Sequence, residues 1–173
     1  MNSAFFGLLY ARKFRRFWFL LLLFSGAHTS SAAEHHDALW PNTTYDERIP
    51  TFDEVLGYKV GEKITSYADM LRYFEALESA APERIKTFEY GRTWEGRKLI
   101  YAAIGNSQSI SNLDALSLGM QQLTEPDFAG ADALMAALPG TVWLAYGVHG
   151  NEISSTDAAM LTAYHLLAAI NEP

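Results

Sequence analysis

The sequence has 173 residues, enough for one domain with short flanking segments. It is 49% hydrophobic and 19% charged, which excludes a wholly disordered protein. Its 13 Lys and Arg against 20 Asp and Glu give a net charge of -7, and this acidity argues against a nucleic-acid-binding protein, which needs a basic face. It has no cysteine and five histidines, so disulfides and thiolate metal sites are excluded and any metal must be held by His and carboxylates.

Residues 1–33 have the composition of a secretory signal peptide. Four basic residues lie between positions 12 and 16, the apolar run Phe17–Phe24 follows, and small residues occupy positions 30–33. We predict cleavage after Ala33 and export to the periplasm or the extracellular space. A membrane anchor is the alternative, but the run is well short of the ~20 residues that span a bilayer. Cleavage leaves 9 of the 13 basic residues and all 20 acidic ones, a net charge of -11, and no membrane association is expected afterwards.

The next elements are a helix and a β-hairpin. Residues 34–60 are polar and proline-rich, and we expect an extended N-terminal segment there. Apolar residues then recur every three or four positions from Ser66 to Ala81, which predicts a helix capped by Ser66 and ended by Pro82. Strand-forming residues at 85–90 and 98–104 flank a glycine-containing turn, which predicts a hairpin. We interpret Arg92, Glu95 and Arg97 at the turn as structural ion pairs.

The last third of the chain is predicted to be helix, helix, strand, helix. Residues 110–123 and 131–138 are weakly amphipathic and helix-like, with prolines and a glycine between and after them. Residues 141–148 form a continuous apolar run, typical of a strand buried on both faces. Ser154 or Ser155 is expected to cap a final helix that continues to about Ala169.

The candidate metal-binding residues lie between that strand and that helix. His149 and Glu152 are three positions apart in the run Gly-Val-His-Gly-Asn-Glu, at the carboxyl end of the expected strand, where α/β sheets form their ligand crevices. Imidazole and carboxylate without thiolate is the ligand set of catalytic zinc. The pattern is short and also fits a surface His beside a Glu that favours a helix N-terminus.

Three stretches resemble the zinc carboxypeptidases of the carboxypeptidase A/B type, in the family's order. Residues 67–82 resemble the first helix, residues 88–99 the early hairpin with its Gly-Arg-Thr-Trp-Glu-Gly-Arg turn, and residues 143–167 the zinc-binding strand, loop and helix. The resemblance implies that His149 and Glu152 bind Zn²⁺, the Glu through both oxygens. It also implies an α/β fold, the α/β/α sandwich with a mixed sheet, that cleaves residues from the C-terminus of a peptide or protein.

The same resemblance implies site residues that lie beyond this sequence. The family's third ligand (a His), its general base (a Glu) and its clamp for the substrate carboxylate come later than position 173. His165 is no substitute, because 13 residues of helix would place it nearly 20 Å from Glu152. We therefore expect residues 61–173 to be the N-terminal part of a truncated catalytic domain, with no catalytic residue of its own and no activity alone.

Two other functions are open. Aspartoacylase-like and desuccinylase-like zinc deacylases resemble the chain at the His-Gly-Asn-Glu loop, but they lack the Gly-Arg-Thr-Trp-Glu-Gly-Arg hairpin. A non-catalytic exported binding domain that keeps half of a metal site is the third possibility, and it would bind zinc weakly and cleave nothing.

Overall fold

The computed structural model describes residues 40–170. The predicted signal peptide and its cleavage site lie outside them. In chain order the elements are β1 (Thr44–Tyr45), α2 (Phe52–Leu56), α3 (Tyr67–Ala80), β2 (Ile85–Arg92), β3 (Lys98–Ile104), α4 (Ser107–Ser111), α5 (Leu113–Gln122), α6 (Ala131–Ala137), α7 (Ser154–Ala168) and β4 (Ala169–Ile170). No helix within this range is both long and apolar enough to cross a bilayer.

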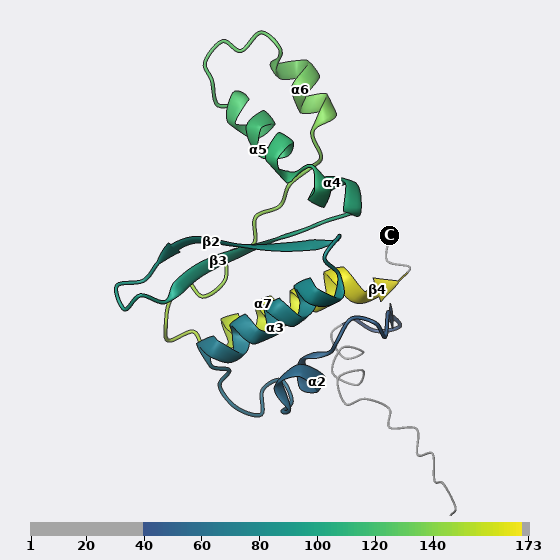
Figure 1. The fold of residues 1–173 in the computed structure, drawn as a ribbon, viewed down its shortest axis with the longest axis vertical. Coiled ribbons are helices and arrows are strands. Elements are labelled where there is room, and N and C mark those ends of the chain that lie inside the picture. The colour runs from purple at the N-terminus through teal and green to yellow at the C-terminus, as the bar shows by residue number, and fades with distance from the viewer. Residues whose placement is uncertain (1–39, 171–173) are drawn as a thin grey trace, which may run out of the picture.

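Helix α3 and the hairpin form as the sequence predicts. The Ser66 hydroxyl accepts the backbone N–H of Asp69 at 3.1 Å and caps α3, and the helix ends immediately before Ala81. Strands β2 and β3 are antiparallel, and Tyr90 is the extra residue of a bulge between Glu89 and Gly91. Helices α3 and α7 lie side by side against one face of this hairpin (Figure 1).

The core lies between α3, α7, α2 and the inner face of the hairpin. Leu77 of α3, Ile85 of β2 and Met160 of α7 are completely buried at its centre. Ile100, Ala102 and Ile104 of β3 pack against it from the hairpin. The opposite hairpin face carries exposed aromatic side chains, because no described helix covers it.

The N-terminal segment is more ordered than we expected. Residues 34–60 were predicted to be extended, yet α2 forms within them and buries Phe52 and Leu56. Thr51 and Glu54 make a reciprocal capping box, and Gly57 ends the helix with a φ of 77°. Strand β1 pairs with β4, so this segment also contacts the far end of the described chain.

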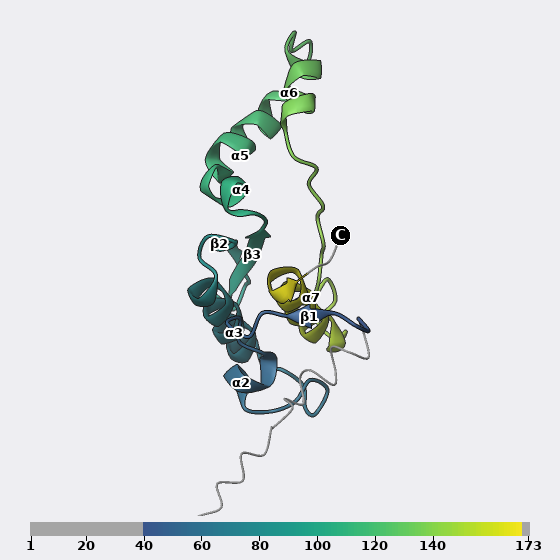
Figure 2. The ribbon, with the colours of Figure 1, turned by 90° about the vertical axis from the view of Figure 1, so that its right-hand side faces the viewer.

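Helices α4, α5 and α6 form an arm that extends away from the core in both views (Figures 1 and 2). The predicted helix at 110–123 is divided at Asn112 into α4 and α5, and the one at 131–138 is α6. From α6 the chain returns to the core as a single extended segment before α7 begins.

The prediction of a buried strand in that returning segment is wrong. Residues 141–148 were expected to be a buried strand, but they pair with no described strand, and Val142, Trp143 and Val148 are 81%, 75% and 70% exposed. A strand needs a neighbouring strand for its backbone hydrogen bonds and a second layer to bury its side chains. The described residues offer neither at this position.

The mixed α/β composition is therefore confirmed, and both described sheets are antiparallel pairs. The expected mixed sheet with helices on both faces does not form among residues 40–170. The capping prediction for α7 was wrong as well: Ile153 occupies the N-cap position, and no side chain caps this helix.

Burial predicts which leucines stabilise the fold. Leu77→Ala empties a completely buried site and should lower the free energy of unfolding by about 2–5 kcal/mol. The control is Leu118→Ala, the same change at a side chain that is 57% exposed, which should cost about 0.5 kcal/mol or less. Urea unfolding measures both, and equal losses would contradict this location of the core.

Candidate metal centre

The His149–Glu152 loop lies between the returning segment and helix α7. The backbone N–H of Glu152 donates to the carbonyl of His149 at 3.1 Å, which closes a tight turn. The N–H of Ser155 in turn bonds the Glu152 carbonyl at 3.1 Å. His149 and Glu152 are thus one turn apart, at the N-terminal end of a helix whose other side is buried in the core.

The side chains of His149 and Glu152 are both exposed, and neither has a hydrogen-bond or ion-pair partner among residues 40–170. Their donors, an imidazole nitrogen and carboxylate oxygens, have the chemistry that zinc prefers. Among the described residues no group of three or more His, Asp or Glu side chains comes together. The donor chemistry of the two residues therefore fits zinc, and the described residues bring no third donor to them.

Two hydrogen bonds hold the chain before His149 against α7. The Gly147 N–H donates to the Ser155 hydroxyl oxygen at 2.7 Å, and the hydroxyls of Tyr146 and Thr162 are 3.0 Å apart. Gly147 has a φ of 67°, a left-handed conformation that glycine adopts without strain. The sequence predicts Ser154 or Ser155 as the helix cap and gives no signal for Thr162, because neither contact is visible in a linear pattern.

His165 lies in the last turn of α7, far from the loop. Its Nδ1 is 3.0 Å from the hydroxyl of Tyr45, and its ring stacks on Trp40 with 4.1 Å between the centroids. These contacts agree with the prediction that His165 is a packing residue. They join α7 to the N-terminal segment.

The hairpin turn is held by ion pairs, as the sequence predicts. Arg97 pairs with Glu95 at 2.9 Å, and Arg92 pairs with Glu89 at 2.8 Å while also donating to the Gly96 carbonyl. The φ of Gly96 is 80°, which closes the turn. Each of these arginines is paired with a nearby carboxylate, which agrees with a structural role for the turn.

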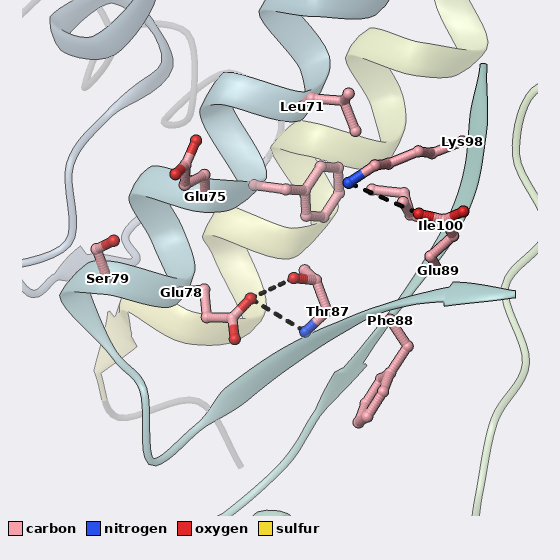
Figure 3. Close-up of a pocket in the computed structure, with 10 residues that line it drawn as sticks. Leu71, Glu75, Glu78, Ser79, Thr87, Phe88, Glu89, Lys98 and Ile100 are labelled. Carbon is pink, nitrogen blue, oxygen red and sulfur yellow. Dashed lines mark hydrogen bonds and ion pairs between the residues drawn. The ribbon is translucent and has the colours of Figure 1, made fainter. Parts of the chain in front are cut away.

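A groove lies between α3 and the hairpin (Figure 3). It contains no histidine, and two of its carboxylates are already engaged: Glu78 with Thr87 and Lys86, and Glu89 with Lys98. Burial alone would raise the pKa of Glu78, but the hydrogen bonds from Thr87 and Lys86 outweigh it and hold that pKa below its usual value. Glu78, Glu89 and Lys98 of the groove are thus paired with one another or with their neighbours.

Comparison with known families identifies the family of the chain. The family model described as zinc carboxypeptidase (peptidase M14) matches residues 70–172, more than half of the chain. The chain belongs to the zinc carboxypeptidase family. No curated protein and no solved structure gave a significant match.

The matched region of this zinc carboxypeptidase family member extends from within α3 to beyond β4. It contains the hairpin and the His149–Glu152 loop, the two motifs on which the sequence resemblance depends. The assignment of those two residues as ligands is a prediction that the match does not test.

If His165 is a packing residue, its contacts should affect stability and not metal binding. Tyr45→Phe removes the hydroxyl that bonds His165 and should lower the free energy of unfolding by about 0.5–1.5 kcal/mol. Zinc affinity, measured by calorimetric titration of the same variant, should match that of the unmodified chain. A large loss of zinc affinity with unchanged stability would reverse the assignment and make His165 part of the metal centre.

Proposed function

We propose that the chain carries the His-x-x-Glu half of the zinc site of an exported metallocarboxypeptidase, which removes residues from the C-terminus of a peptide or protein. The observation that supports this proposal is the position of His149 and Glu152: two uncommitted, exposed donors of the correct chemistry in a loop anchored to a buried helix. Membership of the zinc carboxypeptidase family supports a metal-binding role for that loop over a plain surface turn.

In this proposal His149 donates an imidazole nitrogen to Zn²⁺, and Glu152 donates both carboxylate oxygens. Zinc held by these residues would polarise a scissile carbonyl and lower the pKa of a water molecule. The part of His149 and Glu152 is to hold the ion at the N-terminal end of α7 with their coordinating atoms facing outward. A third ligand, a general base and a clamp for the substrate carboxylate come from outside residues 40–170, and the described residues alone are inactive.

The apolar segment 141–148 belongs to the same proposal. Its large apolar side chains are exposed, and the centroid of the Trp143 ring lies 6.3 Å from that of Tyr101 on the open hairpin face. We infer that it becomes a strand once a neighbouring strand is supplied. The sheet would then be the mixed sheet of an α/β/α sandwich.

Two alternatives predict different products. A zinc deacylase would hydrolyse N-acyl amino acids and not peptides; the hairpin with the Gly-Arg-Thr-Trp-Glu-Gly-Arg turn, which forms in the structure, favours the peptidase. A non-catalytic binding domain is favoured by the presence of only two candidate ligands among the described residues. It predicts weak zinc binding and no hydrolysis of either substrate.

The decisive test uses the native gene product, purified from the exported fraction of the source cells. We expect it to release the C-terminal residue of a peptide with a free carboxylate, to spare the amidated peptide, and to lose activity with a chelator. Glu152→Gln should abolish release, because the amide is neutral and a poor zinc ligand. Glu125→Gln, the same change at an exposed carboxylate in the loop before α6, should have no effect.

Each other outcome has a definite meaning. Hydrolysis of N-acyl amino acids in place of peptides would establish the deacylase. Zinc binding without any hydrolysis would establish the binding domain. Activity that survives Glu152→Gln would show that Glu152 is not a ligand, and peptidase activity of residues 34–173 alone would contradict the proposed inactivity of the isolated chain.

A further inference from the structure

The hydrogen bond between Gly147 and Ser155 encloses both proposed ligands. It joins the backbone N–H of Gly147 to the Ser155 hydroxyl at 2.7 Å, and His149 and Glu152 both lie within the nine residues that it closes. We propose that Ser155 is a positioning residue, which holds the metal loop in the form that presents both donors to one ion. This inference rests on the proposed function.

The loop has few other restraints. Every residue from Gly147 to Ser154 is exposed, and the backbone hydrogen bonds within the loop are the two from Glu152 to His149 and from Ser155 to Glu152. An open loop would have to become ordered when the metal binds, and the conformational entropy that it loses would weaken the metal affinity. A bond that closes the loop beforehand removes part of this cost, as the outer partners of metal ligands generally do.

A second contact supports the same arrangement. Tyr146, next to Gly147, bonds Thr162 at 3.0 Å, and Thr162 is seven residues, about two helical turns, after Ser155. Ser155 and Thr162 therefore share one face of α7, and Tyr146 and Gly147 lie along that face. The chain on the His149 side is held at two points by the helix that follows Glu152.

Helix capping does not explain Ser155. A serine at the N-cap of a helix accepts an N–H of its own helix. In α7 the N-cap position is Ile153, which makes no side-chain cap, and the Ser155 oxygen instead accepts an N–H from the segment before the loop. The hydroxyl thus orders the loop and leaves the helix end uncapped.

The test is zinc titration of the full chain with matched variants. Ser155→Ala removes the acceptor and should weaken zinc binding about 10-fold or more. Ser155→Thr keeps a hydroxyl and should restore the affinity. Ser154→Ala makes the same change one residue earlier, at an exposed serine with no hydrogen bond from its side chain to a described residue, and should have no effect.

A second readout does not depend on the metal. In zinc-free protein, amide hydrogen exchange at Gly147 should become faster in Ser155→Ala and not in Ser154→Ala, while the midpoint of thermal unfolding stays the same. Faster exchange with unchanged zinc affinity would overturn the positioning role, because the bond would then exist without serving the ligands. Equal loss of affinity in the two alanine variants would overturn it too.

Failure of the proposed function would look different. If the unmodified chain binds no zinc, or if His149→Ala binds it equally well, then His149 and Glu152 are not the ligands and both proposals fail. If the unmodified chain binds zinc through His149 and Ser155→Ala binds it equally tightly, only the role of Ser155 fails.

Discussion

The packing of helix α7 is the constraint on which the rest of the structure depends. Met160 and Leu167 are buried against α3 and the hairpin, so the helix cannot shift without opening the core. Its C-terminal end is held as well, because the Arg84 guanidinium donates to the carbonyls of Leu166 and Leu167. The His149–Glu152 loop joins the opposite, N-terminal end of α7, so its position depends on where this helix is packed.

Buried side chains and hydrogen bonds have different roles along α7. Its buried face also carries Tyr164, whose pKa burial raises to about 12, so the ring stays neutral at physiological pH. Its other contacts are hydrogen bonds: His165 to Tyr45 near one end, and Ser155 and Thr162 to the segment before the loop. The core sets where the helix lies, and these directional bonds set where the neighbouring chain lies against it.

Among residues 40–170 the proposed metal centre has two candidate ligands, and the apolar segment that leads to it pairs with no described strand. The segment meets the open face of the hairpin, where the ring centroids of Trp143 and Tyr101 are 6.3 Å apart. Under the proposed function, a further sheet layer that carries a ligand would supply both the strand partner and the third donor, at the strand end where α/β sheets bind their ligands.

The sequence by itself determined the local elements and the family. Spacing and capping residues located α3, the paired strand-formers and turn located the hairpin, and the His-x-x-Glu loop with its flanks pointed to the zinc carboxypeptidases. The capping box at Thr51 and Glu54 was also present in the sequence and would have revealed α2. Tertiary structure decided what depends on distant partners. An apolar run such as 141–148 becomes a strand only beside another strand, and Ser155 serves Gly147 rather than its own helix because the fold brings that segment alongside α7.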